Sequence, residues 1–368
     1  MRLIQVDILR AVAVLLVMGA HLPVSLFERQ TPLTGFLSVW LRCGWTGVDL
    51  FFVLSGFLVS GLLFGEYKAR RRVDLARFLV RRGLKIYPGF YVFLLLTTLY
   101  LALAGLHFPS LRQYVGEIFY FQNYGPHIWE HTWSLAVEEH FYLFIGALIL
   151  YLSKRQGDDP FRVLVLLCGC LGGAILALRI WNACLNPYTH QTHLFPTHLR
   201  IDSLLFGVLL SYCHHFHHDT LRGFVRAHKR GILALSAALL STSLFWTLFD
   251  PFMHAVGFTL LYLGFGGVLA VAVHGVDPSR VTAHAPVQWL ARVGVCSYAI
   301  YLWHIVMARG FPYGALAIPR HYFLSSCVTL AVYVGGAVGL GIVMAHAIEI
   351  PVLKYRDMKI RSNSGSLS

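Results

Sequence analysis

The sequence predicts an all-α membrane protein with about ten transmembrane helices. Hydrophobic residues make up 57% of its 368 residues and charged residues only 13%, whereas soluble domains carry about 25% charged residues. The mean hydropathy is +0.63. Apolar runs of about 20 residues, the length that a helix needs to cross a bilayer, recur along the chain. We expect one membrane domain over residues 1–350 and a polar cytoplasmic tail over residues 351–368.

The first predicted span, residues 7–27, carries two ionisable side chains. Arg10 and His21 bracket ten uncharged residues, and eleven helical steps are close to three turns, which puts both side chains on one face about 16 Å apart. A charge that faces lipid costs about 2.5 kcal/mol or more, so the pair is predicted to be functional. The alternative is a helix end at Arg10 and an interfacial histidine at His21. The run has no small-residue cleavage site, so we expect it to be retained as a signal anchor.

Nine further apolar runs complete the predicted set. They cover residues 46–65, 86–106, 133–152, 162–182, 199–215, 231–249, 255–274, 289–309 and 322–348. The loop at 66–85 is the most basic stretch, and more basic residues follow at 154–155, 222–230 and 354–361. Ten spans put all of these on one side, so the positive-inside rule predicts that both termini are cytoplasmic. These loops account for the formal net charge of +13, and we predict no nucleic-acid partner.

Polar side chains inside the predicted spans fall at two depths. The cytoplasmic layer contains Arg10 and, at the mouth of the third span, Arg81, Arg82, Lys85 and Tyr87. The outer layer contains His21, Trp45, Asp49, Glu138, Glu139, Arg200, Asp202, Tyr301 and His304. A protein that only anchors has no reason to hold so many such groups at matched depths. We therefore expect them to face one another around a polar cavity.

Structural interpretations compete for several of these residues. Glu138 and Glu139 would also suit the solvated start of a helix, and Arg200 with Asp202 would suit an ion pair that only orients helices. His304 would equally suit a satisfied buried histidine next to Tyr301, one turn away.

The histidines and cysteines are not assigned a metal ion. The run of His214, His215, His217 and His218 resembles a metal-binding tract, but it lies on a predicted cytoplasmic loop without evident partner ligands. The seven cysteines are scattered, mostly in apolar runs, and we interpret them as core residues.

Seven segments carry a family resemblance. They are Arg10 to His21, residues 45–57 (WTGVDLFFVLSGF), 81–88 (RRGLKIYP), 133–142 (WSLAVEEHFY), 200–207 (RIDSLLFG), 297–304 (SYAIYLWH) and 348–351 (IEIP). This ordered series resembles the motifs of the membrane acyltransferase family 3, the integral-membrane O-acyltransferases that modify glycans, lipids and antibiotics. One departure is His140, which stands where the family usually has glutamine. Some members carry a C-terminal SGNH-type domain, and we expect none here.

Acyl transfer to a hydroxyl group needs a base, because an alcohol becomes a good nucleophile only as it loses its proton. His21 is the candidate base. A carboxylate can fix the tautomer of such a histidine and stabilise the imidazolium that forms. Glu138 or Glu139 are candidates for this role, and Asp49 is a weaker one.

The oxyanion and the acyl donor need further partners. Candidate donors to the oxyanion are Trp45, Arg200 and Tyr301. The resemblance implies acyl-CoA as a cytoplasmic donor substrate, with no other cofactor. Because guanidinium groups bind phosphate bidentately, its phosphates would suit a basic group made of Arg10, Arg81, Arg82 and Lys85. The remaining expected substrate contacts are Asp49, Tyr87, Asp202 and His304.

The sequence and the resemblance together predict an O-acyltransferase of the bacterial inner membrane. It would move an acyl group, acetyl by resemblance, from acyl-CoA to a carbohydrate or glycolipid hydroxyl. The alternative is a transporter or lipid-binding protein without this chemistry. Transporters usually contain repeated halves with broken helices in matching positions, and the sequence shows no such repeat.

Overall fold

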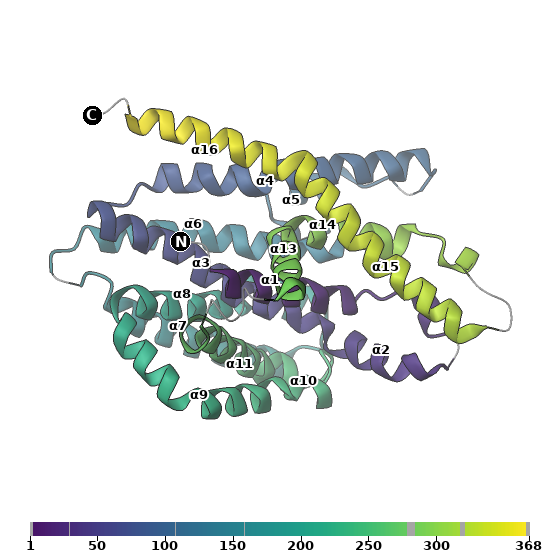
Figure 1. Cartoon of the computed structure of the whole chain (residues 1–368), viewed down its shortest axis with the longest axis horizontal. Coiled ribbons are helices and arrows are strands. Elements are labelled where there is room, and N and C mark those ends of the chain that lie inside the picture. The colour runs from purple at the N-terminus through teal and green to yellow at the C-terminus, as the bar shows by residue number, and fades with distance from the viewer. Residues whose placement is uncertain are drawn as a thin grey trace.

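A computed structural model describes residues 3–28, 30–106, 108–157, 159–277, 284–316 and 321–365. Helices are the only regular elements of this part of the chain (Figure 1). The α-helices are α1 (Ile4–Gly19), α2 (Pro32–Cys43), α3 (Gly47–Arg70), α4 (Leu75–Leu103), α5 (Leu111–Ile118), α6 (Trp133–Ser153), α7 (Val163–Leu185), α8 (Ile201–Phe216), α9 (His218–Leu240), α10 (Thr242–Phe245), α11 (Phe258–Ala270), α13 (Ala285–Val295), α14 (Ser297–Gly310), α15 (Tyr322–Met344) and α16 (Ile350–Gly365). The all-α prediction is confirmed. Most of the predicted polar tail is helical, because α16 extends through it.

The number of spans differs from the prediction. The helical stretches of the described residues that are long and apolar enough to cross a membrane are Pro32–Arg70, Leu75–Leu103, Glu130–Ser153, Val163–Leu185, Met253–Gly275 and Tyr322–Met358. Helices α13 and α14, which meet at a bend of 79°, make a seventh if they form one span. The chain is therefore a polytopic membrane protein with six or seven candidate spans among its described residues, and the prediction of about ten is wrong.

Helix length and charge explain the difference. Helices α1 and α8 each have 16 residues, which is about 24 Å and shorter than the ~30 Å hydrocarbon core. The predicted span 231–249 is divided between the end of α9 and the short α10. The first half of α9 is strongly basic. The apolar runs in the sequence extend past the ends of these helices, so counting runs gave more spans than the helices form.

Close helix contacts hold the centre of the molecule together. A Cβ added to Gly56 of α3 would lie 2.0 Å from the Leu204 carbonyl oxygen of α8, and one added to Gly207 would lie 2.3 Å from that of Val53. Small residues of this kind let two membrane helices approach backbone to backbone. Likewise, α13 packs on α1 at Gly294, where a Cβ would lie 1.7 Å from the Asp7 carbonyl oxygen. These contacts fix α1, α3 and α8 around the site described below.

The two ends of the molecule differ in their connections. Figure 1 shows both termini toward the left, together with the connection between α3 and α4 and the one between α6 and α7. The first connection contains Arg71 and Arg72, and the second contains Lys154 and Arg155. Basic connections thus gather at the end toward which both termini lie.

Candidate active site

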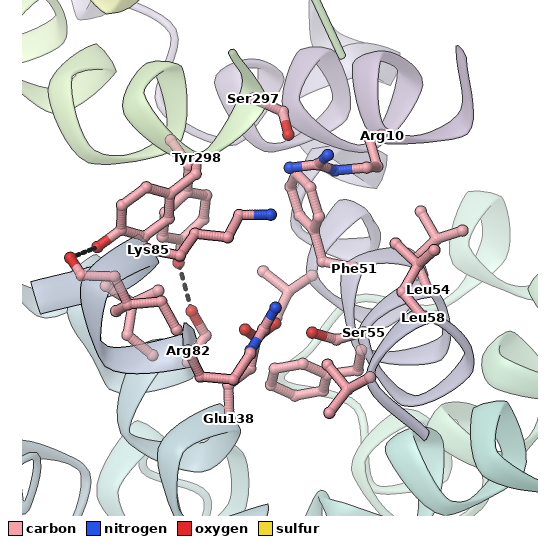
Figure 2. A pocket seen from close by; sticks show the side chains of 17 residues that line it. Arg10, Phe51, Leu54, Ser55, Leu58, Arg82, Lys85, Glu138, Ser297 and Tyr298 are labelled. Atoms are coloured by element: carbon pink, nitrogen blue, oxygen red, sulfur yellow. Dashed lines mark hydrogen bonds between the residues drawn. The ribbon is translucent and has the colours of Figure 1, made fainter. Parts of the chain in front are cut away.

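Three cations line one cavity between the helices. Arg10 of α1 and Arg82 and Lys85 of α4 border a cavity of about 90 Å³, and Figure 2 shows their side chains pointing into it. Arg82 and Lys85 are three residues apart and therefore lie on the same helix face. Glu138 of α6 is the carboxylate that lines the same cavity in the described part of the chain. The charge of the lining is therefore positive.

The rest of the cavity wall is mostly apolar. Phe51, Leu54 and Leu58 of α3 lie along one side in Figure 2. Two polar atoms at the cavity, Ser297 Oγ and Arg82 Nε, are buried and have no hydrogen-bond partner among the described residues. Unused donors beside an apolar wall are the features of a pocket for a ligand with both polar and apolar parts.

Tyrosines, rather than a histidine, hold the two adjacent glutamates. Tyr142 donates a hydrogen bond to Glu138 and accepts one of 2.8 Å from Ser55. The guanidinium of Arg82 lies 4.2 Å from the centre of the Tyr142 ring. On the next residue, Glu139 accepts a hydrogen bond of 3.0 Å from the exposed Tyr87.

His21 lies just beyond the end of α1, and its hydrogen bonds define its tautomer. Its Nδ1 is 3.1 Å from the Val17 carbonyl oxygen and 3.2 Å from Nε2 of His304. Nδ1 of His304 is 2.7 Å from the Tyr301 carbonyl oxygen. A carbonyl only accepts, so both Nδ1 atoms carry the proton and Nε2 of His304 accepts from His21. Nε2 of His21 is then left as an unprotonated nitrogen, the form that a general base requires.

The partners of His21 correct one expectation. Glu138, Glu139 and Asp49 were candidates to orient this imidazole, but the hydrogen bonds described for it lead to Val17 and His304. The reason is position: Glu138 lies with Arg82 and Tyr142 at the cavity.

Tyr301 connects the cavity with the histidines. It lines the cavity, and its ring centre lies 5.9 Å from that of His304. Its hydroxyl group donates to the His131 carbonyl oxygen at 2.5 Å, so Ser134 is the donor in the 2.6 Å bond between the two hydroxyl groups. Tyr301 thus lies between the cavity and the cluster of His21, His131 and His304, which are not themselves part of the described cavity lining.

His131 was missed by the sequence analysis. Its ring centre lies 5.5 Å from that of His304, and its Nδ1 is buried without a partner among the described residues. Glu117 organises the turn before it, because it accepts hydrogen bonds from the backbone N–H groups of Ile128 at 3.0 Å and Trp129 at 3.3 Å. Burial raises the pKa of Glu117 to about 7. The available signal was the position of His131 two residues before the recognisable segment that starts at Trp133.

Charged residues predicted for the outer layer form two buried ion pairs, in which Arg200 and Asp202 each have a different partner. Arg200 pairs with Asp49 at 2.7 Å, and Arg179 pairs with Asp202 at 2.8 Å. All four side chains are buried, and Arg200 also lies 3.7 Å from the centre of the Phe258 ring. The proposed pair of Arg200 with Asp202 is therefore wrong, because each of these residues has another partner. Arg179 of α7 was missed, although an arginine inside an apolar run is itself a signal.

Two further predicted residues lie apart from the cavity lining. Trp45 packs on the Phe258 ring, with 5.9 Å between the ring centres, next to the ion pairs. Arg81 borders a different hollow with Arg77 and Glu66, at the basic end of α3 and α4. Arg82 borders both spaces, so the Arg81–Arg82 pair divides between them.

Comparison with known proteins decides the family. The model of acyltransferase family 3, described as an acyltransferase domain, matches residues 3–346. This chain is a member of that acyltransferase family. The resemblance predicted from the sequence motifs is confirmed.

Curated relatives of this chain are O-acetyltransferases by name. The chain is 28% identical over 326 residues to the peptidoglycan O-acetyltransferase OatA of Listeria monocytogenes, an alignment that covers 82% of this chain and 48% of that protein. It is 26% identical over 317 residues to O-acetyltransferase OatA of Staphylococcus aureus, covering 80% and 50%. A putative O-acetyltransferase of S. aureus strain COL is 27% identical over 360 residues, covering 89% and 53%. The chain thus spans about half the length of the curated relatives it matches. No solved structure matches it significantly.

Proposed function

We propose that this acyltransferase moves an acyl group, acetyl by default, from acyl-CoA to a hydroxyl group of a carbohydrate or glycolipid, with His21 as the general base. The observation that carries the proposal is the hydrogen bonding of His21, which leaves its Nε2 unprotonated. Family membership supports the acyl-transfer chemistry over transport without chemistry. The names of the relatives support acetyl and a carbohydrate acceptor.

The proposed reaction has two steps, attack of the acceptor hydroxyl on the thioester and release of CoA. His21 Nε2 takes the proton of the acceptor hydroxyl while its oxygen attacks the thioester carbonyl. The tetrahedral intermediate then collapses, the carbon–sulfur bond breaks, and the leaving thiolate receives the proton from the imidazolium. The products are an ester and free CoA. Tyr301 and Ser134 also line the cavity, but their protons are used in the bonds to the His131 carbonyl oxygen and to Tyr301, so a donor to the oxyanion would have to exchange one of these bonds.

The cavity supports acyl-CoA as the donor. Arg10, Arg82 and Lys85 offer cationic donors to phosphate, and the apolar wall on α3 suits the acyl end of the thioester. The unpartnered Ser297 hydroxyl and Arg82 Nε leave hydrogen-bonding capacity for the polar pantetheine arm.

The test is transfer by the purified protein in lipid. Labelled acetyl-CoA and oligosaccharide acceptors are supplied, and both acceptor label and released thiol are measured. We expect His21→Ala to lower transfer about 10²–10⁴-fold, the usual contribution of a general base. The matched control is His346→Ala, since His346 also bonds the carbonyl four residues back but is exposed. Near-normal transfer by a stably inserted His21→Ala protein would rule out His21 as the base.

A further inference from the structure

Three histidines from separate segments meet at a place unrelated to the site above. His214 lies on α8, His218 begins α9, and His274 lies in the π-helical turn Val271–Gly275 after α11. One ring nitrogen from each lies within 4.8 Å of the other two. His274 is buried, His214 is half-buried and His218 is exposed. The fold thus brings a distant histidine to two members of the histidine run.

The distance between one nitrogen of His214 and one of His274 matches the distance between two ligands of a metal ion. Nδ1 of His214 is 3.2 Å from Nε2 of His274. Two nitrogens bound to one tetrahedral zinc ion at about 2.0–2.1 Å each are about 3.3 Å apart. The ring centre of His218 lies 5.5 Å from that of His214 and 5.3 Å from that of His274. Because His218 is exposed, its side chain is free to make the small rotation that completes the third distance.

A carboxylate orients the third ligand. Nδ1 of His218 is 3.2 Å from Oδ1 of Asp219. Metal-binding histidines generally donate their other ring N–H to a carboxylate or carbonyl, which fixes the tautomer. With Nδ1 engaged by Asp219, Nε2 is the nitrogen of His218 that is left for a metal. The ring of Phe57 packs against His214 at 5.6 Å and shields one side of the cluster.

The surroundings restrict the kind of metal. Arg226 donates to the His274 carbonyl oxygen at 3.3 Å, and Lys229 donates to that of Gly275 at 3.1 Å. These bonds occupy the nearby carbonyl oxygens, so few oxygen ligands are left for Mg²⁺ or Ca²⁺, which need several carboxylate or carbonyl oxygens. Neutral imidazoles instead favour transition metals such as zinc, which bind nitrogen ligands well.

The histidine run does not act as a unit. Nδ1 of His215 bonds the Ser211 carbonyl oxygen at 2.9 Å, and Nε2 of His217 lies 3.1 Å from the Tyr212 hydroxyl. These two side chains are directed to other partners, so a folded site would use only His214 and His218 of the run.

We propose that His214, His218 and His274 form a binding site for one divalent transition-metal ion, zinc in the cell, with water as the fourth ligand. The ion would link the junction of α8 and α9 to the turn that follows α11. The contacts of Arg226 and Lys229 already join the same elements, so the metal would reinforce an existing junction.

The experiment uses the full chain with an affinity tag that contains no histidine. The protein is purified in detergent without chelator and its metal content measured, then stripped and titrated with Zn²⁺. We expect about one zinc per chain. We also expect His218→Ala and His274→Ala to weaken binding at least tenfold or so, the range seen even for losses around metal ligands. Zn²⁺ should raise the melting temperature of the parent protein and not that of His218→Ala, since a ligand stabilises only the state that binds it.

The matched control is the double variant His215→Ala/His217→Ala, which keeps the cluster but halves the run. Retained zinc affinity in this variant supports the folded site. Three results would each overturn the proposal: no zinc bound by the stripped parent, equal loss in the control, or full affinity in His218→Ala. The first would mean that His214 and His274 simply share a hydrogen bond, and the second that the run chelates without the fold. His274 is buried, so the His274→Ala variant can fail to fold. His218 is exposed, and we expect His218→Ala to fold normally, so its zinc affinity decides the test by itself.

Discussion

At the scale of single residues, His21, the proposed base, is oriented by neighbours that the sequence does not mark as a unit. The Val17 carbonyl is four residues before His21, whereas His304 is 283 residues after it. A carboxylate partner would stabilise a charged imidazolium more strongly than a neutral imidazole does. The observed arrangement fixes the tautomer and ring orientation instead. We therefore propose His304 as a positioning residue for His21.

We predict that His304→Leu lowers kcat about 10–100-fold and leaves KM for acyl-CoA unchanged, because the imidazole of His21 loses one of the two acceptors of its Nδ1 proton and is held only by the Val17 carbonyl oxygen. His304→Gln should recover part of the activity, since its amide oxygen can accept the same bond. Steady-state kinetics of both variants test this, with melting temperature as the folding control. Equal loss in both variants, or a rise in KM alone, would contradict the positioning role.

The pair Arg81 and Arg82 gives a second residue-scale prediction. We expect Arg82→Ala to weaken CoA binding about tenfold or more, because a hydrogen bond to a charged group contributes about 1.5–3 kcal/mol. Arg81→Ala is the matched neighbour, a half-buried residue outside the cavity lining, and should have a smaller effect that falls at high salt, since charges near solvent are screened beyond about 8 Å at physiological ionic strength. Binding is measured by calorimetry at two salt concentrations. Equal effects of both variants would show that the cavity does not hold the phosphates.

The sequence predicted part of this site for a physical reason. Arg10 and Tyr301 are polar residues in apolar runs and Arg82 lies just before one, and burial in a membrane protein brings such groups to a common interior. Their exact partners were not predictable. Tyr301 bonds a carbonyl 170 residues away, and only the packing of α14 against the start of α6 determines that pairing.

At the scale of helices, the two buried ion pairs lock α7, α8 and α3 to one another. Arg179 joins α7 to α8 through Asp202, and Arg200 joins the start of α8 to α3 through Asp49. Arg179 also donates to Thr259 at 2.6 Å next to the start of α11. Buried charges of this kind need their partners, because an unpaired ion in the interior is strongly unfavourable.

We predict that Arg179→Met lowers the free energy of unfolding by about 3–5 kcal/mol, because it leaves Asp202 charged and unpaired in the interior. The double variant Arg179→Met/Asp202→Leu should recover most of this loss, since replacing both members of a buried pair by apolar residues is often nearly neutral. Thermal unfolding in detergent compares the two. If the double variant is as unstable as the single one, the pair is not what holds the helices.

At the scale of the whole molecule, basic residues are concentrated in the connections at one end. The connections with Arg71, Arg72, Lys154 and Arg155 lie at the end toward which both termini lie (Figure 1). The span count did not follow from the sequence, because hydropathy does not register where α1 and α8 stop. The charge asymmetry did follow, because it depends on loop composition alone. By the positive-inside rule we propose that this end faces the cytoplasm.

This orientation predicts a sided reaction. Arg10 at the cavity precedes His21 by about three turns' length of chain along α1, so CoA phosphates bound near Arg10 and Arg82 would leave the acyl end toward the histidines. The pantetheine arm is long enough to reach inward while the charged nucleotide stays behind. We expect oriented vesicles to transfer acyl groups when acyl-CoA is on the basic, cytoplasmic side and the acceptor is on the opposite side, with free CoA appearing only on the side of addition. Placing acyl-CoA on the outer side alone should give no product. Equal transfer with both substrates confined to the cytoplasmic face would refute transfer across the membrane, while leaving the role of His21 to be judged by its own variant.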